Sequence, residues 1–356
     1  MTEVIKVNPV HPEPEKIRAA ANALRQGLLV AFPTETVYGL GANALDCSAV
    51  TRIFEAKGRP SSDPLIVHLA DISWLSRVTS EISPVVLQMA AAFWPGPLTI
   101  IVRKRPEVPD LVTAGRDTVA VRLPSHPVAL ALLKQADVLV AAPSANRFGY
   151  TSPTRASHVL TDMNGRFDVL VDSGETPIGI ESTVLDLSGL RPTILRPGGV
   201  TREQLMMILD NVEVQNLTGS GGFQKSPGQL MKHYSPHAEM VYLVDPLRKR
   251  ALRFLRHIAE KEISNGRSVG LLIVDEDLPI FSGLPVQIAS LGPESDLWGV
   301  AHRLYEGMRA LNSRNVEIIF ARDLGNRGPG LALRDRLRRA ATKVIWQNKE
   351  IDTNLC

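Results

Sequence analysis

The 356-residue chain has only two cysteines, few aromatic residues and no long hydrophobic run. Cys47 and Cys356 lie far apart in the sequence, so neither a zinc knuckle nor a disulfide framework is expected. No apolar segment approaches the ~18 residues that a membrane-spanning helix needs, so we expect no membrane role. The first residues lack the basic and then apolar pattern of a signal peptide, and we therefore expect a cytoplasmic location.

Several motifs that mark enzyme classes are also missing. The sequence has no GxxxxGK[ST] phosphate loop, no HExxH zinc motif and no nucleophile elbow, and we expect no metal ion ligated by the protein. Gly39 and Gly41 loosely match a dinucleotide fingerprint, but a proline and a glutamate separate them from the preceding predicted strand. This spacing disfavours a nicotinamide dehydrogenase. A net charge of +3 permits an anionic ligand or RNA without requiring either.

The length of the chain and its 44% hydrophobic content predict two globular α/β domains. The first is expected over 1–209. It alternates short β-rich segments with helices, and too few helices separate the strands for a purely parallel sheet, so we predict a mixed twisted sheet. The predicted strands are Leu28–Phe32, Leu65–Leu69, Leu98–Val102, Thr118–Leu123, Val138–Ala141, Ser182–Leu187 and Thr193–Arg196.

A smaller second domain is expected over 241–356, after a linker at 210–240. Helical and strand periodicity fades in the linker, where glycine and serine gather. Beyond it strands alternate with helices around 246–263 and 297–311, which predicts a parallel Rossmann-like sheet. The strands predicted there are Val241–Val244, Ser268–Val274, Val286–Leu291 and Val316–Ala321.

Two cations stand two residues apart where a helix must end. An apolar stripe at helical spacing over 49–54 predicts an amphipathic helix, which Gly58 can cap and Pro60 prevents from continuing. Lys57 and Arg59 therefore leave the helix on a constrained backbone. An ammonium and a guanidinium recognise phosphate in complementary ways, which favours a polyphosphate site. Cations near a helix C-terminus also complement the helix dipole, so both interpretations stay open.

The predicted strand at 118–123 places a charged residue on a face otherwise suited to burial. Thr118, Ala120 and Arg122 share one face, which we expect to line a cavity. Because an unpaired buried guanidinium is costly, Arg122 indicates either a structural ion pair or a pocket for a carboxylate or phosphate. His68, on another predicted strand, by itself indicates a core histidine whose hydrogen bonds are satisfied.

Polar groups also stand at the ends of predicted strands. The segment Pro143-Ser144-Ala145-Asn146 follows a strand, so its hydroxyl and amide lie where ligands of open α/β sheets gather. An ordinary polar turn would use the same residue types. Ser182 begins one strand and Arg196 ends another. Each can donate to an anion, and neither is specific alone.

Four motifs stand in a fixed order along the chain: Pro33-Thr34-Glu35-Thr36-Val37-Tyr38-Gly39-Leu40, Lys57-Gly58-Arg59-Pro60, Pro143-Ser144-Ala145-Asn146, and Ser226-Pro227-Gly228 with His233-Tyr234. Taken together they closely resemble the motifs of the two-domain threonylcarbamoyl-AMP synthases, which have an N-terminal YrdC-like domain. The resemblance extends from about residue 14 to about residue 345. It implies a YrdC-like domain followed by the smaller Rossmann-like domain.

The resemblance also implies an activity. Such an enzyme is an L-threonylcarbamoyladenylate synthase, a nucleotidyltransferase that joins L-threonine, bicarbonate and ATP into threonylcarbamoyl-AMP and releases pyrophosphate. Mg²⁺ is expected to enter with ATP. A downstream tRNA threonylcarbamoyl transferase would then modify an adenosine of tRNA, and direct contact between tRNA and this chain stays open. Positioning and cations that stabilise the leaving group suffice for this chemistry in physical terms.

Each matched residue carries an implied role. The residues implied around the ATP phosphates, and so in catalysis, are Lys57, Arg59, Ser144 and Asn146. Those implied to bind threonine are Thr36, His68, Arg122, Ala142 and Ser182. Those implied to bind ATP are Arg59, Asp63, Thr118, Ser144, Ser152, Arg196 and Tyr234. Asp63 stands where relatives often carry asparagine. We further expect Arg122 to hold the threonine carboxylate and the glycine-rich linker before Tyr234 to close over the nucleotide as a lid.

Two other classes of protein remain as alternatives. A non-catalytic RNA-binding module is weakly supported by the run Arg334, Arg336, Arg338 and Arg339, although on a helix such a run is usually a solvated face. A carbamoyltransferase maturation factor would share the first domain type. This chain lacks the cysteine clusters that the zinc modules of such a factor would need.

Overall fold

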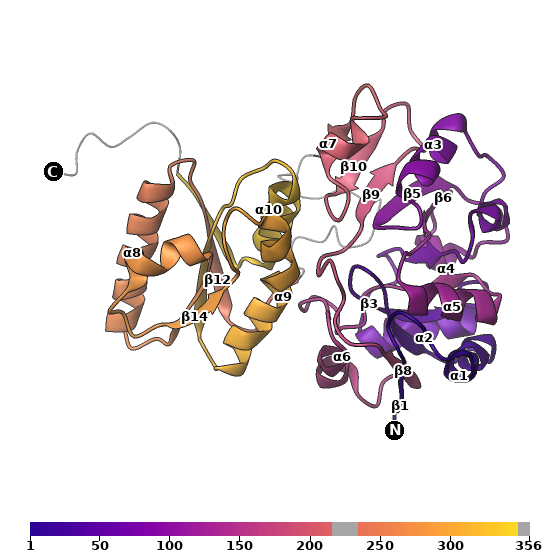
Figure 1. Cartoon of the computed structure of the whole chain (residues 1–356), viewed down its shortest axis with the longest axis horizontal. Helices are drawn as coiled ribbons and strands as arrows, with labels where there is room; N and C mark the ends of the chain where they lie inside the picture. Colours follow the sequence, from indigo (N-terminus) through magenta and orange to yellow (C-terminus); the bar gives the residue numbers. More distant parts are fainter. Residues whose placement is uncertain (216–233, 348–356) are drawn as a thin grey trace. The chain divides into compact units, whose positions relative to one another are not determined.

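The computed structural model describes residues 1–215 and 234–347, which form two compact units (Figure 1). The first unit holds the described residues up to Phe148 and from Ser152 to 215. The second holds Gly149–Thr151 and the described residues from Tyr234 onward. Most of the predicted linker at 210–240, with the lid expected there, falls on 216–233 and so lies outside the described residues. The linker limits and the lid stay predictions.

The first unit is built on an eleven-stranded sheet. Its strands are β1 (Glu3–Lys6), β2 (Val30–Pro33), β3 (Tyr38–Asn43), β4 (Ile66–His68), β5 (Leu98–Arg103), β6 (Thr118–Arg122), β7 (Val140–Ala141), β8 (Val169–Asp172), β9 (Thr183–Asp186), β10 (Thr193–Arg196) and β11 (Glu213–Val214). They lie in the order β1-β8-β2-β3-β7-β4-β6-β5-β9-β10-β11. Strand β6 pairs in parallel with β4 and antiparallel with β5, so the predicted mixed sheet is confirmed.

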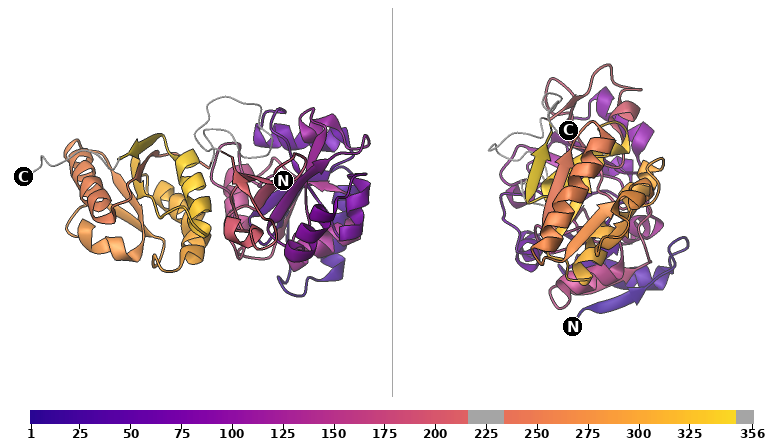
Figure 2. Two further views of the ribbon diagram at one scale, coloured as in Figure 1. Left: turned by 90° about the horizontal axis from the view of Figure 1, so that it is seen from above. Right: turned by 90° about the vertical axis from the view of Figure 1, so that its left-hand side faces the viewer.

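Helices lie against this sheet (Figures 1 and 2). Two apolar clusters join the helices to the strands. The helices are α1 (Pro14–Arg25), α2 (Cys47–Lys57), η1 (Ile72–Arg77), α3 (Pro84–Phe93), α4 (Asp110–Thr113), α5 (Pro127–Ala136), α6 (Ala156–Met163) and α7 (Arg202–Leu205). Helices α1 and α5 pack on β2 and β8 in one cluster. Helices α2 and α3 belong to the other cluster, which also contains apolar side chains from one face of β4, β5 and β6.

Helix α2 ends as its sequence predicts. Asp46 caps its start by accepting hydrogen bonds from the backbone N–H of Ser48 and Ala49. At its end Gly58 adopts a left-handed conformation with φ of 63°, which glycine accepts without steric cost. The helix therefore ends at Lys57, and the chain turns at Gly58 before Arg59.

Strand β3 was not predicted, and it explains the glycine pattern at 39–41. These residues form a central strand paired with β2 on one side and β7 on the other. A Cβ atom on Gly41 would lie 2.8 Å from side-chain atoms of both Phe32 and Val140. Close packing between strands therefore requires this glycine, and the interpretation of Gly39 and Gly41 as a dinucleotide loop is wrong.

The second unit contains a five-stranded sheet that is parallel throughout. Its strands are β12 (Glu239–Val244), β13 (Val269–Ile273), β14 (Gln287–Ser290), β15 (Ile318–Arg322) and β16 (Lys343–Trp346), in the order β14-β13-β15-β12-β16. The helices are α8 (Arg248–Ser264), η2 (Asp275–Phe281), α9 (Leu297–Ser313) and α10 (Pro329–Ala340). Helix α8 covers one face, and α9 and α10 cover the other (Figure 1). The predicted Rossmann-like sheet is confirmed.

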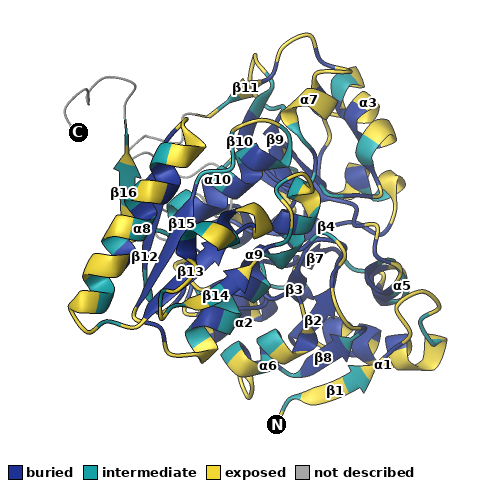
Figure 3. Cartoon of the chain, turned by 60° about the vertical axis from the view of Figure 1, so that its left-hand side comes forward, coloured by how far each residue is buried: buried dark blue, intermediate teal, exposed yellow. Residues whose placement is uncertain are grey.

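Burial follows this layering. In Figure 3 the strands β12, β13 and β15 are buried, whereas the outward side of α8 is exposed. Apolar residues of α8 join side chains of these strands in one cluster. None of the helices within 1–215 and 234–347 is long and apolar enough to cross a membrane.

Candidate active site

One part of the first sheet carries polar and basic side chains on the face opposite the larger apolar cluster. A small apolar patch there consists of one residue from each of β4, β5, β6, β9 and β10. Strand register places the predicted site residues around this patch, because Ile66 lies opposite Ala120 and His68 lies opposite Arg122. Thr118, Ala120 and Arg122 alternate along the same face of β6, as predicted.

Arg122 joins the first motif to this face. Its Nη1 donates to Oγ1 of Thr36 at 3.0 Å, and its Nε donates to the carbonyl of Gly96 at 3.3 Å. Its Nη2 lies 2.7 Å from Oε1 of Glu35, and both side chains are buried. The ion pair left open by the sequence therefore exists. It leaves the role of Arg122 toward a ligand carboxylate as a prediction.

His68 lies beside Arg122 on the adjacent strand, and its imidazole packs edge-on against Phe32 with ring centroids 6.2 Å apart. Burial, with the nearby positive charge of Arg122, lowers the pKa of His68 to about 3. Its Nδ1 is buried without a hydrogen-bond partner among the described residues, so the expectation of a satisfied core histidine is wrong for this atom. Ala142 comes directly after β7, and its backbone N–H donates to the carbonyl of Ile66.

The loop before β9 holds further predicted residues. Oγ of Ser182 lies 2.8 Å from Oγ1 of Thr99, and Nη2 of Arg196 donates to Oγ of Ser182 at 3.2 Å. Oγ of Ser152 donates to the buried carboxylate of Glu181. This loop thus links residues predicted on the threonine side with residues predicted on the ATP side.

Lys57 is almost fully buried where α2 meets the loop after β7. Its Nζ donates to the carbonyl oxygens of Ser144 and Asn146, and its own carbonyl accepts the N–H of Phe148. Burial, and then the charge of Arg59, hold the pKa of the Lys57 ammonium well below its usual value. The structure thus brings the second and third motifs together, which sequence spacing alone does not require.

Arg59 and Asp63 complete this basic corner. Nη2 of Arg59 lies 2.9 Å from Oδ2 of Asp63, and Nη2 also donates to the carbonyl of Pro64. Burial raises the pKa of Asp63 against the opposing effect of the cations around it, namely Arg59, Lys57, Arg196 and Arg116. One buried carboxyl group therefore lies within electrostatic reach of several cations from separate segments.

Two further predicted site residues, Thr118 and Tyr234, make contacts of a different kind. Thr118 is half-buried at the start of β6, opposite Arg103. Tyr234 belongs to the second unit, where its ring stacks on Tyr305 with centroids 5.8 Å apart and lies 5.0 Å from the guanidinium carbon of Arg336. Its φ of 64° is left-handed, which is uncommon for a bulky residue. Its implied contact with ATP stays a prediction.

Sequence reasoning missed two buried acids, Glu35 and Glu181. Both pair with predicted site residues, Glu35 with Arg122 and Glu181 with Ser152. Glu35 lies inside a quoted motif, and a buried acid beside a predicted buried arginine is a signal that could have been used. Glu181 precedes Ser182 and offers no pattern of its own. Only the fold brings it to Ser152.

These features define an α/β protein with buried cations at the end of a helix. Residues 22–198 match the Sua5/YciO/YrdC family, described as telomere recombination, and residues 200–342 match the threonylcarbamoyl-AMP synthase C-terminal domain. The chain belongs to the threonylcarbamoyl-AMP synthase family.

Full-length similarity to named relatives carries that assignment. The chain is 41% identical to the threonylcarbamoyl-AMP synthase of Pyrococcus abyssi over 96% of this chain and 98% of the relative. It is 42% identical to that of Bacillus subtilis, over 92% and 93%. A crystal structure of P. abyssi Sua5 complexed with L-threonine has a TM-score of 0.91 and 40% identity, and it covers 98% of this chain and 100% of that one.

The low pKa of His68 predicts acid sensitivity. An unfolded histidine binds a proton near pH 6.5, whereas His68 in the native protein does so only near pH 3. The unfolded state therefore binds more protons between these values, and stability falls as pH falls through this window. We expect a His68→Gln protein to lose less thermal stability between pH 7 and pH 5 than the wild type. The exposed His257→Gln serves as control, and equal losses in all three proteins would contradict the prediction.

Proposed function

We propose that the chain synthesises threonylcarbamoyl-AMP from L-threonine, bicarbonate and ATP with release of pyrophosphate. The observation that carries the proposal is the convergence of basic side chains from separate segments, Lys57, Arg59, Arg116 and Arg196, around the buried Asp63. Burying a cation is costly, and the ammonium of Lys57 donates to carbonyl oxygens rather than to an acid, so a polyphosphate would add compensating negative charge. The names of the relatives agree with this chemistry.

The proposed reaction needs positioned groups and no covalent intermediate with the protein. The ammonium of threonine loses protons and its nitrogen bonds to the carbon of bicarbonate, which releases water and leaves a carbamate. A carbamate oxygen then bonds to the α-phosphorus of ATP while the bond from that phosphorus to the bridging oxygen breaks. Negative charge grows on pyrophosphate, and Lys57 and Arg59 stabilise it. Arg122 is proposed to hold the threonine carboxylate.

Mg²⁺ is proposed to enter with ATP. Both oxygens of Asp63 are buried and accept no hydrogen bond among the described residues, although one is ion-paired with Arg59. Because Asp63 is ion-paired with Arg59 and lies among further cations, the ion would be held by phosphate oxygens and water rather than by the protein. Bound there, the ion would neutralise charge on the phosphates. No step assigned to the protein's own residues depends on it.

The product is proposed to pass to a downstream tRNA threonylcarbamoyl transferase, which would modify tRNA in the cytoplasm. The alternative of an RNA-binding module loses its support. Arg334 pairs with Asp323, and Arg336 and Arg339 both pair with Asp335. This run is therefore largely neutralised within the second unit and is not a solvated basic face. Direct contact with tRNA stays open.

Pyrophosphate release tests the proposal. Purified protein with Mg-ATP should release pyrophosphate only when both L-threonine and bicarbonate are present, because the carbamate must form before the phosphorus is attacked. Each substrate is omitted in turn, and L-serine replaces L-threonine in a further control. Release that needs neither substrate, or no release at all, would contradict the proposed function.

A further inference from the structure

Glu35 is a buried acid beside the predicted threonine residues, and the proposed reaction has not yet used it. It lies in the segment between β2 and β3, and its side chain is 6% exposed. The guanidinium of Arg122 contacts Oε1 of Glu35 through Nη2 and Oγ1 of Thr36 through Nη1. One arginine thus holds Glu35 next to a residue predicted to bind threonine.

The ion pair between Glu35 and Arg122 leaves hydrogen-bonding capacity unused. Both carboxylate oxygens of Glu35 and Nη2 of Arg122 are buried, and none of them forms a hydrogen bond with the described residues. The 2.7 Å contact brings the two charges together without the angles of a hydrogen bond. Buried charged groups are costly in this condition, and a ligand that supplies the missing donors and acceptors removes the cost.

The backbone fixes Glu35 in this position. The carbonyl of Glu35 accepts the N–H of Ile178 at 2.9 Å, and the carbonyl of Thr36 accepts the N–H of Gly179 at 3.1 Å. Oγ1 of Thr34 accepts the N–H groups of Thr36 and Val37. The backbone that carries Glu35 is therefore fixed, so ligand binding needs no rearrangement of this segment.

We propose that Glu35 binds the α-ammonium group of the amino-acid substrate while Arg122 binds its carboxylate. The proposal rests on the proposed function, which supplies an α-amino acid as substrate. Such a molecule carries an ammonium and a carboxylate on one carbon, so it matches a carboxylate and a guanidinium held in contact. The ammonium has three N–H donors, and the oxygens of Glu35 are acceptors that the described residues do not use.

Other partners for Glu35 fit less well. The nearby His126 is buried, and burial lowers its pKa despite the opposing effect of the Glu35 charge, which disfavours the cationic form as a partner for Glu35. Its Nδ1 already accepts the backbone N–H of Val128. A metal ion would need more ligands, and the described parts of the chain hold no group of three or more His, Cys, Asp or Glu residues suited to one.

Ligand discrimination tests the proposal without turnover. Calorimetry would compare the binding of L-threonine with that of 3-hydroxybutyrate, which lacks the ammonium, to wild type and to Glu35→Gln. We expect wild type to favour threonine, and Glu35→Gln to reduce that preference by about tenfold to a hundredfold. In Arg122→Lys and Arg122→Ala, discrimination against 1-amino-2-propanol, which lacks the carboxylate, should fall instead. Comparing threonine with each of the two analogues therefore distinguishes the role of Glu35 from the role of Arg122.

Controls separate binding from folding. Glu107→Gln removes the acid of an exposed pair with Arg105 and should leave the preference for threonine unchanged. If Glu35→Gln does not fold, as judged by thermal unfolding, Glu35→Asp answers the same question, because its shortened carboxylate should give an intermediate preference. An unchanged preference in a folded Glu35 variant would overturn the inference while leaving the proposed function intact. A wild type that does not bind threonine would overturn the proposed function itself.

Discussion

Replacing Lys57 with methionine is expected to lower the rate of pyrophosphate release by about a hundredfold to a thousandfold, the loss typical of removing one charge-stabilising group. The Nζ atom is fixed by the carbonyl oxygens of Ser144 and Asn146, so its charge cannot be replaced by a neighbouring mobile cation. Methionine keeps the length and apolar stem of the side chain and removes the charge together with the N–H donors of Nζ. The measurement is the kcat of pyrophosphate release at saturating Mg-ATP, threonine and bicarbonate.

The stability of the same variant should move in the opposite direction or not at all. A buried ammonium whose pKa is held low by desolvation is a cost to the native state, and removing it relieves that cost. We therefore expect Lys57→Met to melt at or above the wild-type temperature. It should also retain threonine binding, because Lys57 is assigned to the phosphates and Arg122 to the amino acid.

Two controls define the result. Lys16→Met removes an exposed lysine that pairs with Glu13, and its rate should equal that of the wild type. Lys57→Arg keeps the charge but carries a larger head group into a fully packed position, so it should recover little activity. A Lys57→Met protein within tenfold of wild-type kcat would show that another group stabilises the leaving pyrophosphate.

The helix end around Lys57 shows what sequence alone can predict. The apolar stripe, Gly58 and Pro60 determine where α2 stops, because capping and backbone restriction are local effects. The contact between Lys57 and the loop at 144–146 depends on the pairing of β3 with β7, which is long-range. Local rules therefore locate the two cations, and only the fold shows what holds them.

The failure to predict β3 has a similar physical origin. Strand β3 reads Tyr-Gly-Leu-Gly-Ala-Asn, and its glycines and asparagine are weak strand formers. Tertiary packing overrides this propensity, since a central position between two strands admits only small residues at Gly41. Strands β12 and β13 consist of long apolar runs in a parallel sheet buried on both faces, and they were predicted for that reason.

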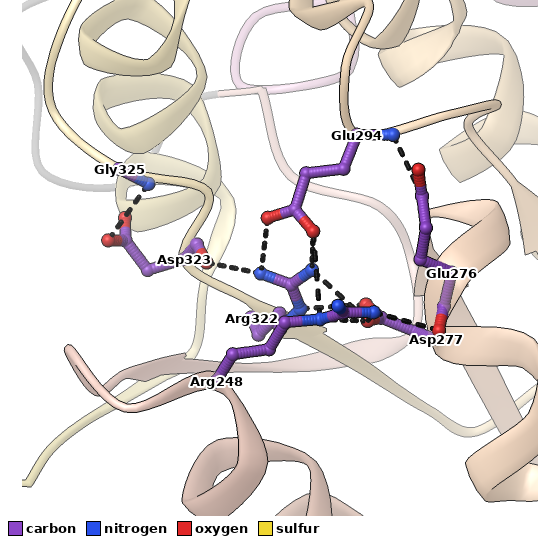
Figure 4. A network of polar contacts seen from close by, with 7 residues as sticks. All are labelled: Arg248, Glu276, Asp277, Glu294, Arg322, Asp323 and Gly325. Carbon is purple, nitrogen blue, oxygen red and sulfur yellow. Dashed lines mark hydrogen bonds and ion pairs between the residues drawn. The ribbon is translucent and has the colours of Figure 1, made fainter.

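The second unit carries an ionic network at the carboxyl ends of its strands (Figure 4). Arg322, at the end of β15, contacts Asp277 through Nε at 2.7 Å and Glu294 through Nη2 at 2.8 Å. Arg248 adds a second cation on Asp277 at 3.0 Å. Asp277 is completely buried, and these two arginines compensate its negative charge.

Replacing Asp277 with asparagine is expected to destabilise the second unit by about 3–5 kcal/mol, the usual cost of breaking a buried ion pair from one side. The change keeps the side-chain shape and leaves the buried Arg322 with Glu294 as its remaining acidic partner. Hydrogen exchange in the full chain measures the effect locally. Amides of β13 and β15 should exchange about a hundredfold to a few thousandfold faster, whereas amides of β5 and β6 should be unchanged.

Paired variants decide whether the cost comes from the charge left behind. Glu260→Gln removes the acid from an exposed pair with Arg256 and should change exchange by less than about fivefold. Asp277→Asn combined with Arg322→Met should cost less than the sum of the two single changes, because it removes both buried charges together. Additive costs, or slow exchange retained in Asp277→Asn, would contradict the prediction. Packing around η2 and β15, rather than the ionic network, would then stabilise the carboxyl ends of these strands.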